Sequence, residues 1–424
     1  GILLINCPWN AKQLDEKIPA DIRQKLFAKN AKLYIMNARE IAEQNGLGNH
    51  VNIPLQAAFF ALTNILPEAE YKEYMASAIR KKFFAKGEDV VAKNIATIDA
   101  GAKAPVLVPI PDYWQNPDTD ASSQKDNKNL PEIVTKILTP INRCEGDSLP
   151  VSAFKKYTDG TIELGLTAYE KRAIATKVPE WDPNKCIQCN RCSYVCPHAV
   201  IRPYILTKDE VASAPSGFKV KEAIGAKDMF FSLQISRDDC TGCGSCYNVC
   251  PAKEKAISPV AIETSTSLPE EWNYALSLPE RSNLFDQWSV KGSQFKTPLL
   301  EFSAACAGCG ETPYAKLMTQ LFGDRVYWAN ATGCSQAWGA AMPGIPYTKN
   351  KEGRGPAWSN SLFENNAEFS LGMCLSVTQQ RNAVKQLAEQ LLTEDIPASL
   401  KDATTKWLNA SEDFETSRLC GEDL

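Results

Sequence analysis

The stretch KCIQCNRCSYVCP, residues 185–197, carries four cysteines separated by two, two and three residues and followed at once by proline, and DCTGCGSCYNVCP, residues 239–251, repeats it. Two-residue gaps let three consecutive thiolates point inward from one tight loop. The three-residue step and the proline turn the fourth sulfur away. Gly242 and Gly244 let backbone amides approach negatively charged sulfurs. The repeat therefore predicts a pair of metal–thiolate sites.

This spacing is typical of bacterial ferredoxins, in which three cysteines of each quartet bind one 4Fe–4S cluster and the fourth binds the other. We therefore expect two clusters with exchanged fourth ligands. The first set is Cys186, Cys189, Cys192 and Cys250, and the second is Cys240, Cys243, Cys246 and Cys196. Zinc ribbons also use CxxC pairs, but two quartets that end in Cys-Pro favour iron–sulfur clusters. His198 is interpreted as a packing or capping residue.

A third group of cysteines lies in CAGCGE, residues 306–311, and in TGCS, residues 332–335. The first motif is a glycine-rich turn before a predicted helix over residues 312–322. The second follows a predicted strand over residues 325–329. Both loops are expected at one end of the same α/β unit, where Cys306, Cys309 and Cys334 supply three ligands of a further metal site. Buried free cysteines are the alternative, and Cys374 and Cys420 are weak candidates for a fourth ligand.

Composition excludes several other classes of function. The 424 residues contain 15 cysteines and only 2 histidines, so multi-histidine metal sites and histidine-based catalysis are disfavoured. The net charge is −4, and no basic stripe points to nucleic acid. No apolar run approaches the ~20 residues that a membrane span needs. Disulfide scaffolds are typical of small secreted proteins, so we interpret the cysteines as metal ligands.

The regions around the cysteines read as a multi-domain α/β chain. Strand and helix signals alternate near the start, with strands expected over residues 1–6 and 32–37 and helices over 19–30, 38–44, 52–66, 67 onward and 89–100. A turn at Thr158–Gly160 is expected to join two short strands over residues 154–158 and 161–166. Residues 111–129 are rich in Pro, Asp, Asn and Ser and read as a linker. Helical periodicity returns over residues 376–406.

Together these motifs resemble pyruvate:ferredoxin (flavodoxin) oxidoreductase. GILLIN (residues 1–6), NIPLQAAFF and KNIATIDA resemble its gamma-type α/β domain, LTAYEKR (residues 166–172) its small EKR domain, and GRGPAWSNSLFENNAEF (residues 353–369) its thiamine-diphosphate domain. The resemblance implies four parts: a gamma-type α/β domain, partial at its N-terminus, over 1–112; a linker and β-containing EKR domain over 113–181; a ferredoxin-like α+β domain with two 4Fe–4S clusters over 182–270; and a partial thiamine-diphosphate-binding α/β domain over 271–424.

The resemblance also implies a reaction. Pyruvate is oxidatively decarboxylated with coenzyme A to acetyl-CoA and CO2, and electrons pass through three 4Fe–4S clusters to ferredoxin or flavodoxin. Cys306, Cys309 and Cys334 then resemble ligands of the cluster nearest to thiamine diphosphate and its Mg2+. Glu311 and Cys334 resemble thiamine-diphosphate contacts, and Asn52 and Asn94 resemble coenzyme A contacts. For both asparagines, helix capping is the alternative. No catalytic residue is assigned.

Two features of that family are missing from the sequence. No GDG motif follows the third cysteine group, and the family's fourth ligand of that cluster lies further on. We therefore expect an internal section of a longer polypeptide that is inactive alone and homodimeric when complete. A two-cluster electron carrier without substrate chemistry, or an enzyme for another 2-oxoacid, are the alternatives. The clusters imply a reducing, anaerobic cytoplasm or an organelle of an anaerobic eukaryote, with neither nucleic acid nor membrane as partner.

Overall fold

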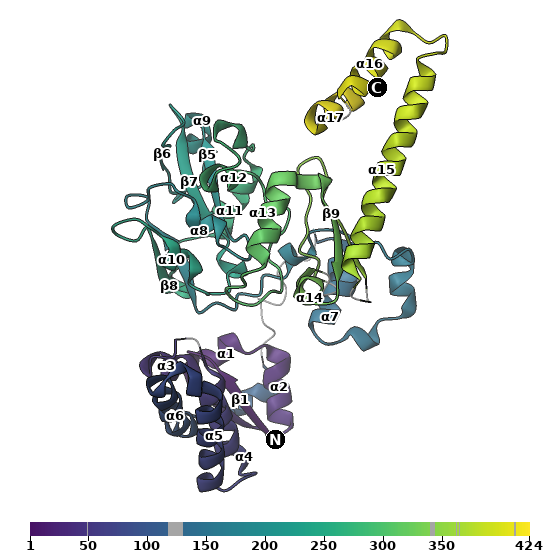
Figure 1. Ribbon diagram of the computed structural model, residues 1–424. Coiled ribbons are helices and arrows are strands. Elements are labelled where there is room, and N and C mark those ends of the chain that lie inside the picture. Colours follow the sequence, from purple (N-terminus) through teal and green to yellow (C-terminus); the bar gives the residue numbers. More distant parts are fainter. Residues whose placement is uncertain (49, 118–129, 340–343, 362, 364, 411–412) are drawn as a thin grey trace. The chain divides into compact units, whose positions relative to one another are not determined.

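The computed structural model (Figure 1) describes residues 1–48, 50–117, 130–339, 344–361, 363, 365–410 and 413–424. The chain is a mixed α/β protein that divides into two compact units, residues 1–129 and 130–424. The predicted linker over 111–129 falls largely on residues 118–129, which lie outside the described residues. The four predicted domain boundaries stay predictions. No helix among the described residues is long and apolar enough to cross a membrane.

The first unit is built on a three-stranded sheet in the order β1-β2-β3. Strands β1 (Ile2–Asn6) and β2 (Lys32–Met36) run parallel, and β3 (Val106–Val108), which the sequence did not reveal, pairs antiparallel with β2. The unit's helices are α1 (Leu14–Lys17), α2 (Ala20–Ala28), α3 (Ala38–Gln44), α4 (Asn52–Thr63), α5 (Glu68–Phe83) and α6 (Glu88–Lys103). The predicted strands and helices of this region are therefore confirmed.

Helices α4, α5 and α6 pack on one another through apolar side chains. Ile53 and Ala57 of α4 lie in one buried cluster with Met75 of α5 and Val91 and Ile98 of α6. The contact between α4 and α6 is close because α6 presents a glycine, Gly101, to the backbone of α4. Helices α4 and α5 of this layer line the cavity described below.

The second unit begins with a segment that the sequence analysis read wrongly. Residues 151–157 form a 3₁₀ helix, and residues 160–165 form no strand, so neither predicted strand of the EKR region exists. The turn between them is present, because the Asp159 carboxylate accepts from the backbone N–H and hydroxyl of Thr161. Tyr157, Ile162 and Leu164 instead pack individually against a buried cluster that includes Leu166 and Tyr347. The apolar residues are satisfied by this packing without strand pairing.

Two antiparallel ladders organise the cysteine repeats. Strand β4 (Lys177–Trp181) precedes the first repeat and pairs with β8 (Ile257–Ala261), which follows the second. Strand β5 (Ile201–Leu206) follows the first repeat and pairs with β7 (Phe230–Ile235), which precedes the second and also pairs with β6 (Lys221–Glu222). The ladders bring the start of each repeat to the end of the other.

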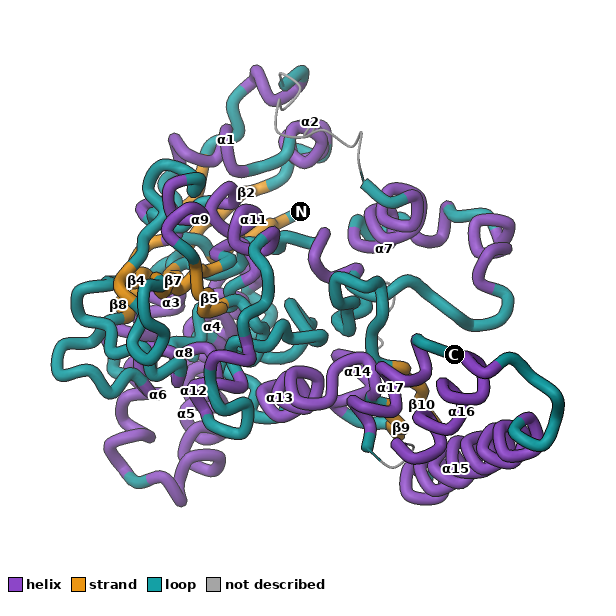
Figure 2. The backbone as a smooth tube through the Cα atoms, turned by 90° about the horizontal axis from the view of Figure 1, so that it is seen from above, coloured by secondary structure: helices purple, strands orange, loops and turns teal. Residues whose placement is uncertain are grey.

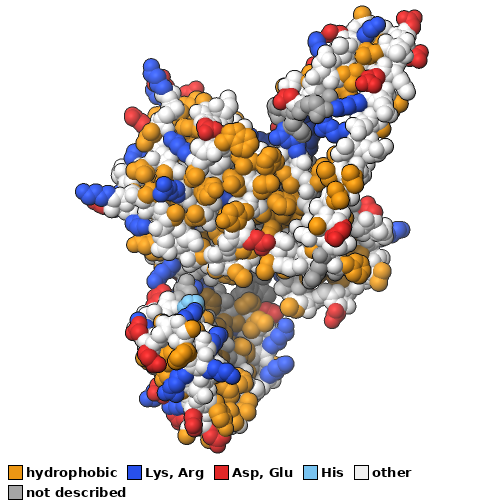
Figure 3. Space-filling view, viewed as in Figure 1, with side chains coloured by type: hydrophobic (Ala, Val, Ile, Leu, Met, Phe, Trp, Pro, Cys, Tyr) orange, Lys and Arg blue, Asp and Glu red, His pale blue; other side chains and the backbone are white. Residues whose placement is uncertain are grey.

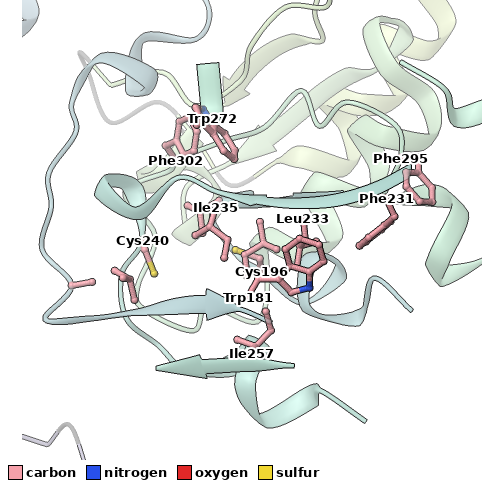
Figure 4. Packing of buried hydrophobic residues seen from close by; sticks show 14 of the residues in the cluster. Trp181, Cys196, Phe231, Leu233, Ile235, Cys240, Ile257, Trp272, Phe295 and Phe302 are labelled. Carbon is pink, nitrogen blue, oxygen red and sulfur yellow. The ribbon is translucent and has the colours of Figure 1, made fainter. Parts of the chain in front are cut away.

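Short helices and one longer helix complete this part of the unit. They are α7 (Thr139–Asn142), α8 (Arg191–Tyr194), α9 (Lys208–Ala212), α10 (Ser245–Val249), α11 (Pro269–Ser277) and α12 (Val290–Ser293). Figure 4 shows the core between the strands, where Trp181 and Leu233 lie near Cys196 and Phe231 lies beside Phe295. Two of the predicted ligands, Cys196 and Cys240, belong to this buried core.

The last region contains helix α13 (Thr312–Phe322), parallel strands β9 (Tyr327–Ala331) and β10 (Ala357–Ser361), and helix α14 (Cys334–Gly339). The predicted helix over 312–322 is confirmed. Helix α15 (Asn366–Leu391) contacts both strands (Figure 2), and α16 (Ala398–Ala410) and α17 (Phe414–Glu422) pack together beyond it. Figure 3 shows many exposed apolar side chains on one face of the unit. The exposed apolar side chains of the chain include Tyr314, Met318 and Phe322 of α13.

Candidate metal centres and cofactor pocket

The cysteine loops share one local backbone geometry. In each repeat the second residue after the first cysteine and the residue after the second cysteine adopt left-handed conformations: Gln188 and Asn190 in the first repeat, Gly242 and Gly244 in the second. The loop of the third group repeats the turn at Gly308, two residues after Cys306. Glycine adopts this conformation without strain. The first repeat achieves it with polar residues, which the sequence analysis missed.

These turns aim backbone amides at sulfur. The N–H of Gln188 donates to Cys186 Sγ at 3.3 Å, that of Gly242 to Cys240 Sγ at 3.4 Å, and that of Glu311 to Cys309 Sγ at 3.4 Å. The Gln188 side chain fixes its own loop, because it donates to the Glu222 carbonyl and accepts from the Ile224 N–H. Such N–H···S contacts stabilise thiolates and metal-bound sulfur.

The first predicted ligand set gathers around one pocket. Cys186, Cys189, Cys192 and Cys250 all line it, together with apolar side chains of Trp181, Phe231, Leu233 and Ile257. Three of these cysteines come from the first repeat and the fourth from the second. The β4–β8 ladder accounts for this, since it places the residues before Cys186 beside those that follow Cys250.

The second predicted set lies together in the same crossed manner. The pKa of the Cys246 thiol is raised by burial and by the negative charge of its neighbours Cys196, Cys240 and Cys243. Burial also raises the pKa of Cys240 to about 12, with Cys196 and Cys243 acting in the same direction. The β5–β7 ladder joins the end of the first repeat to the start of the second. The structure therefore brings Cys196 to the second repeat's cysteines.

The electrostatics of these pockets fit a positively charged occupant. Cys192 is partly buried, and its pKa is raised by desolvation and then by the charges of Cys246, Cys186 and Cys189. Thiolates crowded in a dry pocket repel one another, and iron both displaces their protons and neutralises their charge. No group of three or more His, Cys, Asp or Glu side chains in the described ranges is close enough to hold a single metal ion. The donor set, four thiols per site, is that of a 4Fe–4S cluster.

The third cysteine group is only partly assembled. Cys306 and Cys309 share one turn, in which the Cys309 N–H donates to the Cys306 carbonyl. Cys334 begins α14, and Trp338 of that helix donates to the Glu311 carboxylate at 2.9 Å. This bond joins the two loops at one end of the region. Cys306 and Cys334 are exposed, and the structure places Cys374 on α15 and Cys420 on α17.

The third loop packs directly on the second repeat. A Cβ built on Gly308 would lie 3.5 Å from the Cys243 Cβ, in ordinary van der Waals contact. His198 joins the same loops: its Nε2 lies 3.0 Å from the carbonyl oxygen of Ala305, the residue before Cys306, and its Nδ1 lies 3.5 Å from the Thr241 hydroxyl. Burial lowers its pKa. His198 is therefore a buried packing residue between cysteine loops.

The two asparagines predicted to contact coenzyme A have different surroundings. Asn52 is exposed at the first position of α4 and makes no capping hydrogen bond, so the capping alternative is wrong for it. It lines a cavity of about 290 Å3 with Tyr74 and Lys82 of α5. Asn94 is buried within α6 and donates to the Val90 carbonyl one turn earlier, so it neither caps a helix nor reaches this cavity.

Three family models match successive parts of the chain. Residues 1–104 match the pyruvate ferredoxin/flavodoxin oxidoreductase model, residues 119–175 match EKR, described as a domain of unknown function, and residues 185–253 match the 4Fe-4S dicluster domain. The dicluster match with its cysteine motif implies two 4Fe–4S clusters. It covers both cysteine quartets and leaves the third group outside.

Relatives extend the similarity to the whole chain. A pyruvate-flavodoxin oxidoreductase of Enterobacter agglomerans is 46% identical over 99% of the chain, and a pyruvate:ferredoxin oxidoreductase of Moorella thermoacetica is 45% identical over 100%. The mitochondrial pyruvate dehydrogenase [NADP(+)] of Euglena gracilis is 42% identical over 96% of the chain and 22% of its own length. The chain spans only 36% of the length of the first two relatives.

Proposed function

Because the chain corresponds from end to end to a section of the pyruvate:ferredoxin/flavodoxin oxidoreductases, we propose that it is the electron-transferring section of such an enzyme. The complete enzyme then oxidises pyruvate with coenzyme A to acetyl-CoA and CO2 and reduces ferredoxin or flavodoxin. The observation that carries the proposal is the crossed gathering of two cysteine quartets. That arrangement serves electron transfer, and the relatives' names supply the substrate.

When bound, 4Fe–4S clusters accept and release single electrons at potentials set by their surroundings. The chain's own residues hold the sites in a row. A Cβ added to Gly308 of the third loop would touch Cys243 of the second set, and Cys246 of that set contributes to raising the pKa of Cys192 of the first. Ile187, which lines the first pocket, is half exposed. We infer that electrons enter at Cys306, Cys309 and Cys334 and leave near Ile187.

The third site and the thiamine site belong to the same proposal. Cys306, Cys309 and Cys334 supply three ligands, and the fourth comes from outside this chain. Glu311 faces the same loops, where its carboxylate is held by Trp338. In the complete enzyme we propose that Glu311 and Cys334 contact thiamine diphosphate with its Mg2+. We also propose that the complete enzyme is a homodimer. A reducing, anaerobic cytoplasm suits oxygen-sensitive clusters of this kind.

We propose that the cavity beside Asn52 receives coenzyme A. It offers a polar amide, the aromatic side chains of Phe60 and Tyr74, and the ammonium group of Lys82 for a phosphate. Asn94 lies outside this cavity. We therefore propose that it supports α6 and does not touch coenzyme A. The residues that line the cavity come from α4, α5 and the turn between them.

Replacing Lys82 with alanine is expected to weaken coenzyme A binding roughly 10- to 150-fold, because one charge-assisted hydrogen bond contributes roughly 1.5–3 kcal/mol. Lys81→Ala is the matched control, since Lys81 is the neighbouring exposed lysine on the same helix and does not line the cavity. Isothermal titration calorimetry of both variants measures the effect. Equal affinities for the two variants would place coenzyme A elsewhere.

The proposed function is tested with anaerobically prepared chain. We expect about eight irons per chain and no pyruvate-dependent reduction of ferredoxin by the chain alone. Co-expression with the remaining segments of the Moorella thermoacetica relative is expected to restore that activity. Turnover by the chain alone would contradict the need for those segments. Restored activity with another 2-oxoacid but not with pyruvate would change the substrate. Iron binding without restored activity on any 2-oxoacid would favour the electron carrier.

A further inference from the structure

Lys316 of α13 is a buried lysine surrounded by carbonyl oxygens. It is 1% exposed, and its Nζ donates to the backbone carbonyls of Ser193, Tyr194 and Cys196. The distances to Tyr194 and Cys196 are 3.2 and 3.3 Å. A lysine ammonium has three N–H donors, so these acceptors are the complete set for the charged form.

The charge of Lys316 lies beside the segment that connects the two predicted ligand sets. The three carbonyls belong to α8 and the turn after it, which joins Cys192 to Cys196. Cys192 lies with the first ligand set and Cys196 with the second. Carbonyls at the end of a helical turn carry partial negative charge. Lys316 therefore sits at the point where the chain passes from one site to the other.

The side chain is held in place by a second buried network. The Gln294 amide accepts from the Ser193 hydroxyl at 3.0 Å and donates to Gln320 Oε1 at 3.1 Å, and Gln320 donates to the Lys296 carbonyl. Ser193, Gln294 and Gln320 are each less than 5% exposed. This network ties α13 to α8 and fixes where the ammonium group lies.

Helix α13 is reversed relative to an ordinary amphipathic helix. Its buried face carries Thr312, Lys316, Thr319 and Gln320, while Tyr314, Met318 and Phe322 are exposed. Burying a cation is costly unless an opposite charge accompanies it. Within the described part of the chain, no carboxylate forms a salt bridge with Lys316. The negative charge that suits this position is that of the iron–thiolate sites on either side.

We propose that Lys316 is the buried counter-charge of both cysteine quartets and raises the reduction potentials of the clusters that they hold. The inference rests on the proposed iron–sulfur function and deepens it. A positive charge stabilises the reduced, more negative state of a cluster, and the low dielectric of the interior strengthens this effect. Helix α13 begins directly after Glu311 of the third loop. Through this helix, Lys316 also joins the third loop to the two-cluster core.

The test compares two variants of anaerobically prepared, iron-loaded chain. Lys316→Gln keeps donors for the carbonyls but removes the charge, whereas Lys316→Arg keeps the charge. Redox titration followed by electron paramagnetic resonance is expected to show lower midpoint potentials for both clusters in Lys316→Gln and smaller changes in Lys316→Arg. Gln320→Leu removes the hydrogen bonds to Gln294 and to the Lys296 carbonyl but no charge. It is expected to lower thermal stability without shifting the potentials.

Each outcome has a distinct meaning. Unshifted potentials in a fully iron-loaded Lys316→Gln variant would overturn the proposal. Loss of iron in Lys316→Gln but not in Lys316→Arg would support it, because charge would then be required for assembly. Equal loss of iron in both variants would overturn it and leave Lys316 a packing residue. Failure of the unsubstituted chain to bind iron would overturn the proposed function itself.

Discussion

A chain that lacks both Cys196 and Cys243 is expected to keep about four of its eight irons, whereas one that lacks both Cys196 and Cys189 is expected to keep almost none. Cys196 belongs to the first repeat by sequence, but the structure gathers it with Cys240, Cys243 and Cys246. The first double variant therefore damages one site twice. The second damages each site once.

Iron analysis and low-temperature electron paramagnetic resonance of the two double variants measure this difference. Cys144→Ala is the control, since Cys144 is an exposed free thiol outside the cysteine motifs, and it is expected to leave the iron content unchanged. If each repeat bound its own cluster, the two double variants would exchange their results. The midpoint temperature of thermal unfolding should also fall most in the variant without clusters, because metal binding contributes to folding.

The crossed gathering of the cysteines could be predicted from the sequence, because the spacing is typical of bacterial ferredoxins, whose fourth cysteine turns towards the other cluster. Spacing fixes which sulfurs share a loop and which one is turned away. The pairing of β4 with β8 could not be read from the sequence, since strands joined by long insertions have no local signal for their partner. The structure supplies that pairing, and with it the physical reason why cysteines of the two repeats lie together.

Local signals predicted the first unit and the helix over residues 312–322 correctly, but they were misleading over residues 154–166. The apolar run within residues 52–66 and the acidic first turn after Pro67 predicted α4 and α5 because long, strongly patterned helices have clear signals. Residues 154–166 contain the same kinds of residues as a hairpin, but their apolar side chains pack singly on a distant cluster. Short segments of this kind are decided by tertiary contacts rather than propensity.

The role of α13 shows a further limit of sequence analysis. A helix with apolar residues at positions 314, 318 and 322 is expected to bury that face. The structure buries the opposite face, because Lys316, Thr319 and Gln320 find acceptors and donors on α8 and on residues 294–299. These partners lie on other segments of the chain, and the sequence of α13 has no local signal for packing against them. The reversal became visible only with the tertiary contacts.

Replacing Gly101 with alanine is expected to destabilise the first unit by about 1–3 kcal/mol, despite the better helix propensity of alanine. A Cβ at this position would lie 2.5 Å from the Cα and the carbonyl oxygen of Pro54. Backbone atoms of a packed helix cannot move aside as a flexible side chain can. The separation of α4 and α6 would increase, and the gain of up to ~1 kcal/mol from propensity would not offset this.

Gly372→Ala on α15 is the matched control. Gly372 also lies within a helix, but a Cβ there meets no atom within 4 Å, so the same substitution is expected to stabilise α15 slightly. Hydrogen exchange measured by mass spectrometry on the whole chain can follow α4 and α6 separately from α15. Faster exchange in α4 and α6 of Gly101→Ala is expected, together with weaker coenzyme A binding, because α4 carries Asn52 and Gln56 of the proposed cavity. Unchanged or slower exchange would show that the two helices can separate without cost, and the close contact with Pro54 would then not hold this layer together.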